Sequence, residues 1–162
     1  MMSDKIDDVL PRKTKAGSRA VKAIHGVREI EPDPQFELDM AAHLRGRLSR
    51  EQLLEAYAQH AAGATPIDDI MRRVCLRALA KSMGSGATVR RSLTVIHPET
   101  FEIGAGVFFG EQSIIQGRFD GRLVIGNGVW IGPQSYFDAR DLILEDYVGW
   151  GSGAKVLGSE HT

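Results

Sequence analysis

The feature that most constrains this chain is a six-residue repeat that runs from residue 103 to residue 161. Glycine follows the leading residue of several hexads, and four extra residues interrupt the count before Ile125. The leading positions are Ile103, Phe109, Ile115, Ile125, Ile131, Phe137, Ile143 and Gly149. A hexapeptide repeat is typical of a parallel β-helix, in which each coil buries its apolar side against its neighbours. The sequence therefore predicts a mainly β fold whose coils consist of three hexads each.

Two other positions of the hexad have defined roles in such a coil. The fifth position is a second, weaker inward channel, occupied by Val107, Ser113, Phe119, Val129, Ser135, Asp141, Tyr147 and Gly153. The fourth position lies at a corner, where positive φ favours glycine. That position is held by Gly106, Gly128 and Gly158, and also by Gln112, Gln134 and Arg140.

A change in composition near residue 83 marks a boundary between two architectures. Four glycines precede Met83, and 14 glycines are found from Met83 onward. We expect a flexible N-terminal arm over residues 1–34, a helical segment over 35–83 and the β-helix over 84–162. A basic cluster between Arg12 and Lys22 lies in the arm, where such composition is typical of a solvated tail.

Capping signals predict the helices of the middle segment. Ser49 and Gln52 form a capping box, and Thr65 precedes a proline at the first turn of a second helix. A shorter helix is expected over residues 36–44. The second helix has an apolar face (Ile67, Ile70, Met71, Val74 and Leu79), with Arg72, Arg73 and Arg77 elsewhere on its surface. These helices are expected to cover the first coil, which would otherwise expose an open sheet edge.

Charge and composition exclude several classes of protein. The formal net charge is −1, which gives no electrostatic reason to expect binding to nucleic acid or to an anionic membrane. Cys75 is the single cysteine, so no internal disulfide can form. No apolar run is long enough to span a bilayer, and the start of the chain does not resemble a secretory signal. A soluble, cytoplasmic protein is expected.

The repeat region resembles the hexapeptide-repeat acyltransferases, especially sugar and xenobiotic O-acetyltransferases. The resemblance covers residues 67–162 and rests on Val124–Pro133 (VIGNGVWIGP), Gly149–Val156 (GWGSGAKV) and the final GSEHT. It implies a left-handed β-helix, acetyl-CoA as co-substrate, no metal, and a homotrimer with active sites between subunits. Such a trimer would also explain outward aromatic residues at Trp130, Tyr136 and Tyr147.

The resemblance also implies site residues. His161, in the GSEHT segment, would act as the general base that takes a proton from the acceptor hydroxyl, a role suited to imidazole. Glu160 or Asp138 would orient that imidazole. Trp150, expected at an outward-facing place, would contact the sugar or the pantetheine arm or form a subunit contact. The backbone amides of residues 151–154, including Gly151, Gly153 and Ala154, would stabilise the oxyanion.

Several alternatives remain open at this stage. The same base would serve N-acetylation of an amino sugar, and Cys75 lies in the helical part, which disfavours an acyl-cysteine route. Because relatives of this type continue with further coils beyond the histidine, the chain is expected to be truncated at its C-terminal end. A non-catalytic scaffold is a second class of function. A zinc hydratase is a third, but it needs three convergent histidines, and only His97 and His161 lie in the repeat region.

Overall fold

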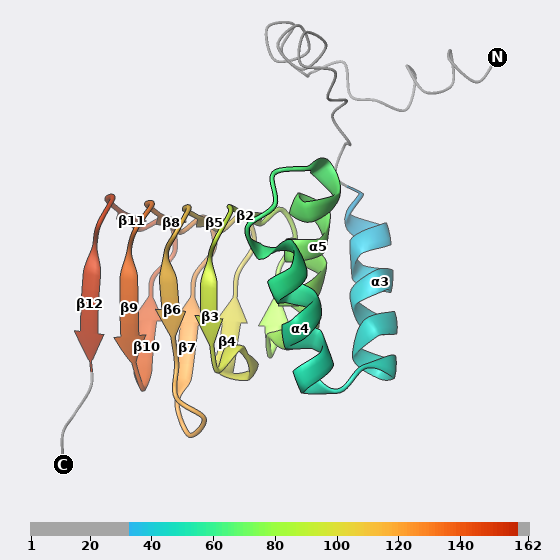
Figure 1. The fold of residues 1–162 in the computed structure, drawn as a ribbon. Helices are drawn as coiled ribbons and strands as arrows, with labels where there is room; N and C mark the ends of the chain where they lie inside the picture. The colour runs from blue at the N-terminus through green and yellow to red at the C-terminus, as the bar shows by residue number, and fades with distance from the viewer. Residues whose placement is uncertain (1–32, 159–162) are drawn as a thin grey trace, which may run out of the picture. The chain divides into compact units, whose positions relative to one another are not determined.

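The structure, a computed structural model, describes residues 33–158 as a helical segment followed by a β-helix (Figure 1). Residues 1–32 of the predicted arm and the residues after Gly158 lie outside these described residues, and Pro34, the last residue assigned to the arm, begins α3. The helices are α3 (Pro34–Arg47), α4 (Arg50–Ala61) and α5 (Pro66–Leu79), and a short 3₁₀ helix, η1, spans Pro98–Thr100. The predicted capping box at Ser49 is present, and Thr65, the predicted cap residue of α5, forms a second one with Asp68. Helix α3 is longer than expected at both ends.

The strands form three parallel four-stranded sheets, and each coil contributes one strand to each sheet. Sheet A contains β1 (Ser82–Met83), β4 (Phe101–Ile103), β7 (Arg122–Ile125) and β10 (Asp141–Leu144). Sheet B contains β2 (Thr88–Val89), β5 (Phe108–Phe109), β8 (Trp130–Ile131) and β11 (Gly149–Trp150). Sheet C contains β3 (Thr94–Ile96), β6 (Ile114–Gln116), β9 (Tyr136–Ala139) and β12 (Lys155–Gly158). The predicted left-handed parallel β-helix is thus confirmed, with four coils in the described chain.

The register shows that the coils are longer than three hexads. Met83, Ile103, Ile125 and Leu144 are successive partners in sheet A, which gives coil lengths of 20, 22 and 19 residues. The equivalent inward ladders are Val89, Phe109, Ile131, Trp150 in sheet B and Val95, Ile115, Phe137, Val156 in sheet C. Within each coil these three ladder positions are always six residues apart. The six-residue spacing therefore holds from sheet A to sheet B and from sheet B to sheet C, but not from sheet C to sheet A of the next coil.

All of the extra residues are at one corner, where the chain passes from sheet C to sheet A. We call this the variable corner: residues 97–100, 117–121 and 140, which separate β3 from β4, β6 from β7 and β9 from β10. Because the other two corners keep their length, the inward stacks stay aligned through all four coils. Insertions in solenoids commonly map to one face, which is often the binding face.

Arg140 adds one residue between β9 and β10, so the hexad count made from the sequence assigns the wrong inward residues after Phe137. Ile143 is 64% exposed, and Leu144 takes the inward place with 3% exposure. For the same reason Trp150, and not Gly149, is the inward residue of β11. The fifth-position channel holds for Val107, Ser113, Val129 and Ser135, which are buried. It fails for Phe119, Asp141, Tyr147 and Gly153, which are exposed.

Two corner stacks have positive φ, as the repeat predicts. One consists of Gly86, Gly106, Gly128 and Tyr147, and the other of Ser92, Gln112, Gln134 and Gly153. The predictions for Gly106, Gly128, Gln112 and Gln134 are confirmed. Those for Gly158 and Arg140 are wrong, because Gly158 lies within β12 and neither residue has positive φ.

The helices close the first-coil end of the prism, as predicted (Figure 1). One continuous hydrophobic cluster extends from Leu53 and Tyr57 of α4 through Val74 of α5 into the coils. The Tyr57 hydroxyl donates a 2.7 Å hydrogen bond to Leu93 O, and the amide of Ser92 donates to Ala61 O. Burial raises the pKa of Tyr57 well above its usual value. Helix α5 thus supplies the apolar surface that covers the first coil.

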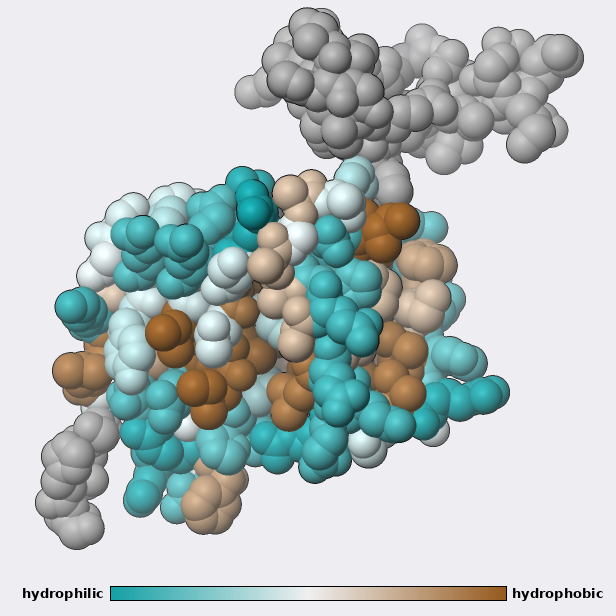
Figure 2. Space-filling view, viewed as in Figure 1, coloured by the Kyte–Doolittle hydropathy of each residue, from teal (hydrophilic) through white to brown (hydrophobic). Residues whose placement is uncertain are grey.

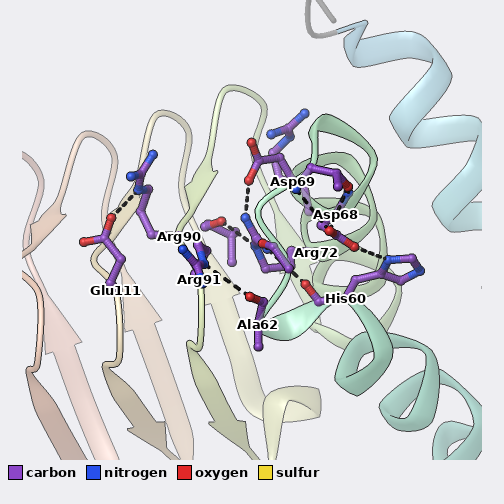
Figure 3. Close-up of polar contacts among 12 residues, drawn as sticks. His60, Ala62, Asp68, Asp69, Arg72, Arg90, Arg91 and Glu111 are labelled. Carbon is purple, nitrogen blue, oxygen red and sulfur yellow. Dashed lines mark hydrogen bonds and ion pairs between the residues drawn. The ribbon is translucent and has the colours of Figure 1, made fainter. Parts of the chain in front are cut away.

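Arg72 departs from the sequence interpretation, which placed it on the polar surface of α5. Its side chain is only 1% exposed and lies between α5 and β2 (Figure 3). Nε donates to Val89 O at 2.9 Å, and Nη1 donates to His60 O at 3.0 Å and to Gly63 O at 2.6 Å. Nη2 pairs with Asp69. Arg72 therefore connects α5 to the first coil and to the loop after α4.

None of the helices in the described part of the chain is long and apolar enough to cross a membrane.

Candidate functional site

The outer face of sheet C and the variable corner beside it carry several polar side chains that could contact a ligand, among them Asp138, Arg118 and His97. Outward ladders on this face run Ile96, Gln116, Asp138, Leu157 and Thr94, Ile114, Tyr136, Lys155. Hydrophobic side chains gather over the middle of this face, around β3, β6 and β9 (Figure 2). Ile96 is 36% exposed and Leu157 is 69% exposed. The face therefore combines apolar contact surface with polar groups at its edge.

Asp138 is the predicted site residue that lies on this face. Its carboxylate forms an ion pair with Arg118, from the loop between β6 and β7. That ion pair is made by Oδ1, and the Tyr136 hydroxyl lies 3.5 Å from Oδ2. Asp138 is thus a mostly buried carboxylate whose charge is balanced by Arg118. Sequence reasoning did not identify Arg118 as its partner, because the loop that carries Arg118 breaks the repeat.

His97 begins the variable corner in the first coil, with a left-handed φ of 56°. Its Nδ1 lies 3.0 Å from Glu99 Oε2, and Glu99 Oε1 lies 2.5 Å from Arg50 Nη2 of α4. The ring of Phe119, a side chain 76% exposed, lies 6.3 Å from the imidazole ring, centroid to centroid. A carboxylate on one ring nitrogen fixes the orientation of an imidazole and leaves the other nitrogen available. The sequence did not predict this pair.

Trp150 does not have the outward position that the sequence predicted. It pairs with Ile131 on the inward ladder, and its ring meets Phe137 edge-on at 5.7 Å and 90°. The outward tryptophan is Trp130, which is 44% exposed and stacks on Phe108 with centroids 5.0 Å apart and planes 7° apart. Trp130, Tyr136 and Tyr147 all point outward, as expected. The hexad count assigned the wrong orientation to Trp150 because of the extra residue at position 140.

The backbone amides expected to form an oxyanion hole are mostly engaged within the protein. The amide of Gly153 donates to Pro133 O at 2.8 Å, and the amide of Ala154 donates to Gly151 O at 3.1 Å. Both are ordinary corner hydrogen bonds of the solenoid. In this conformation, Gly153 and Ala154 do not present free donors to an oxyanion, and Gly151 is the remaining candidate of the three.

His161 and Glu160 lie outside the described residues. The chain reaches them through β12, in which Leu157 pairs with Asp138 and Gly158 pairs with Ala139. Gly158 therefore has the place in the fourth coil that His97, Gly117 and Ala139 have in the first three. Gly158, the last described residue, therefore lies beside Ala139 at the end of sheet C that leads into the variable corner.

A second histidine–carboxylate pair lies in the helical segment. His60 Nδ1 is 2.8 Å from Asp68 Oδ1, and Asp68 also accepts hydrogen bonds from Thr65 (Figure 3). These bonds, that to His60 first, lower the pKa of Asp68 to about 2. Asp68 is the N3 residue of the α5 capping box, so this pair fixes the α4–α5 connection.

The described residues contain no group of three or more His, Cys, Asp and Glu side chains arranged to hold a metal ion. Comparisons of the chain with known protein families, with curated proteins and with solved structures found no match.

Proposed function

We propose that this protein is an acetyl-CoA-dependent acyltransferase that acetylates a hydroxyl of a sugar-type acceptor, with His161 as general base. The parallel β-helix is compatible with the hexapeptide-repeat transferases that the sequence resembles. The observation that supports the proposal is the register of β12, in which Leu157, four residues before His161, pairs with Asp138 of the Asp138–Arg118 pair. A base and a buried carboxylate from neighbouring coils would then face the same acceptor.

In this proposal, His161 removes the acceptor proton as the hydroxyl oxygen attacks the acetyl carbonyl carbon of the thioester. The C–S bond then breaks, and CoA leaves as the thiol after taking up a proton. Asp138 would orient the base or accept a hydrogen bond from the sugar. Glu160 is a second candidate for orienting the base. N-acetylation of an amino sugar would use the same groups. A homotrimer in the cytoplasm, with the outward aromatic residues at subunit contacts, remains part of this proposal.

The test measures release of free CoA thiol from acetyl-CoA with a panel of sugars and amino sugars. The variants are His161→Ala, His97→Ala and, as a matched control on an exposed position of α3, His43→Ala. We expect acceptor-dependent release that falls by at least about 100-fold in His161→Ala and stays unchanged in His43→Ala. If His97→Ala loses the activity and His161→Ala keeps it, the His97–Glu99 pair is the catalytic centre and the assignment of His161 is wrong.

A non-catalytic scaffold is the second candidate, and one observation favours it. The amides of Gly153 and Ala154 are used in corner hydrogen bonds, so a preformed oxyanion hole would need other donors. Isothermal titration with CoA separates the two candidates, because a scaffold has no reason to bind it. Absence of both CoA binding and thiol release would reject the acyltransferase.

A further inference from the structure

A pocket in the helical cap has no part in the proposed acyl transfer. It has a volume of about 430 Å³ and lies where α3, the end of α5 and β1 meet. This is the helical end of the prism, away from β12. Ala41, Ala78 and Met83 form its buried apolar floor, and Leu38 adds an exposed apolar edge. A volume of this size falls within the roughly 300–1,000 Å³ typical of small-molecule sites.

Three cations line the pocket: Arg45, Arg77 and Lys81. Arg45 is held by the carbonyls at the end of α5, with Nε 2.9 Å from Ala78 O and Nη2 2.5 Å from Ala80 O. Arg77 donates to Met83 O and, at 2.8 Å, to Gly84 O. These backbone contacts fix both guanidinium groups without neutralising them. They leave Nη1 of Arg45 and Nε of Arg77 without a hydrogen bond to the described residues.

None of the described residues that line the pocket is acidic, and the carboxylates that act electrostatically on its cations have other partners. Glu37 acts electrostatically on Arg77, but both of its oxygens accept from Arg73, at 2.9 and 3.0 Å. Glu102 interacts electrostatically with Lys81, but both of its carboxylate oxygens accept hydrogen bonds from Arg122, at 2.6 and 3.2 Å. The C-termini of α3 and α5 contribute partial negative charge of roughly half a unit each. Three full cations exceed that contribution, so the pocket has net positive charge.

We propose that this pocket binds a small amphipathic anion, with a carboxylate or phosphate head on the arginine side and an apolar body over the alanine and methionine floor. A guanidinium whose geometry is fixed in advance suits either head, because its remaining N–H groups can donate to the oxygen atoms of the anion. Partial burial lowers the pKa of Arg77, which shows that this cation has lost hydration that an anion would replace. Lys81 is exposed at the rim and is free to move onto the ligand.

Gly46 provides a test that does not depend on the structural arginines. It lies in α3 on the pocket wall, and a Cβ built there meets nothing within 4 Å. Gly46→Leu would therefore place an isobutyl group into the space. It would also replace a poor helix former with a good one, so the variant should fold. Gly46→Ala is the matched control, because it changes the helix propensity but leaves most of the volume empty.

The probes for isothermal titration on the full chain are sodium octanoate, octyl phosphate, acetate, inorganic phosphate and 1-octanol. We expect octanoate or octyl phosphate to bind, with at least tenfold weaker binding for the head groups alone and for 1-octanol. Gly46→Leu should weaken binding at least tenfold and Lys81→Gln severalfold, while Gly46→Ala keeps it. Binding should also weaken as salt increases.

Three results would overturn the proposal. One is that neither octanoate nor octyl phosphate binds. Another is that 1-octanol binds as tightly as octanoate, which would make the pocket a purely apolar one. The third is that Gly46→Leu, with its fold confirmed by circular dichroism, binds like the unaltered protein, which would place the ligand elsewhere. None of these results depends on acetyl-CoA turnover, so this proposal and the acyltransferase can fail separately.

Discussion

Replacement of Arg72 by methionine tests whether this buried arginine holds the helices on the β-helix. Methionine keeps an unbranched stem of similar length but removes every donor. The carbonyl of His60 keeps a bond from the amide of Ala62. The carbonyls of Val89 and Gly63 lose the Arg72 donors that lie 2.9 and 2.6 Å away. An unsatisfied buried acceptor costs about 1–3 kcal/mol. We therefore expect the free energy of unfolding to fall by about 3 kcal/mol.

Urea denaturation followed by two probes measures this loss. Circular dichroism at the helix band reports α3, α4 and α5, and tryptophan fluorescence reports the third and fourth coils through Trp130 and Trp150. The matched control is Arg90→Met, which removes an ion pair whose arginine is 48% exposed and should cost less than about 1 kcal/mol. The loss of free energy of unfolding in Arg72→Lys should fall between those of Arg72→Met and Arg90→Met, because a lysine ammonium group cannot reach all of the oxygens that Arg72 contacts. A loss in Arg72→Met no larger than that in Arg90→Met would refute the role assigned to this side chain.

Three further predictions concern the core and the titrating groups. Phe109→Ala removes a fully buried ring and should lower the free energy of unfolding by about 3–5 kcal/mol. Phe119 is 76% exposed, so Phe119→Ala should change that free energy by less than about 0.5 kcal/mol in the same urea titration. Burial raises the pKa of Cys75 to about 11, so iodoacetamide at pH 8 should add no mass to the native protein but should alkylate it in urea. The pKa of Asp68 is lowered to about 2 from 3.8, so its stabilising contribution is present above pH 4 and is lost as the pH falls toward 2. The melting temperatures of the unaltered protein and of Asp68→Asn should converge over that range, and a gap that stays constant would contradict the assignment.

The sequence predicted the fold because the inward residues of each coil recur at a fixed spacing on two sides of the triangle. Ile103, Phe109 and Ile115 could be assigned correctly because no insertion lies between them. Ile143 and Trp150 could not, since one extra residue at Arg140 reverses the orientation of the following strand and leaves no mark in composition. The variable corner differs in length from coil to coil, so its residues add no periodic signal to the sequence. The wrong inward assignment after Arg140 is therefore visible only in the register of the paired strands.

The site was harder to predict for a different reason. Asp138 was identified, but its partner Arg118 lies 20 residues before it, and the ion pair of Glu99 with Arg50 joins residues 49 apart. The buried Arg72 was missed because charged side chains are almost never fully buried unless they are paired. Its partners are mostly backbone carbonyls, which a sequence pattern does not reveal. His161 and Glu160 stay predictions.

The short separation between paired strands also has a consequence for how the chain folds. Neighbouring coils join residues only 19 to 22 positions apart, so no coil has to wait for a distant segment before it can pair. The helical segment and the first coil supply the largest shared apolar surface, and each later coil can form on the one before it. We expect protection of the backbone amides against hydrogen exchange to decrease from β2 to β11. The molecule should then lose its fourth coil first, by fraying, while the helices and the first coil stay folded.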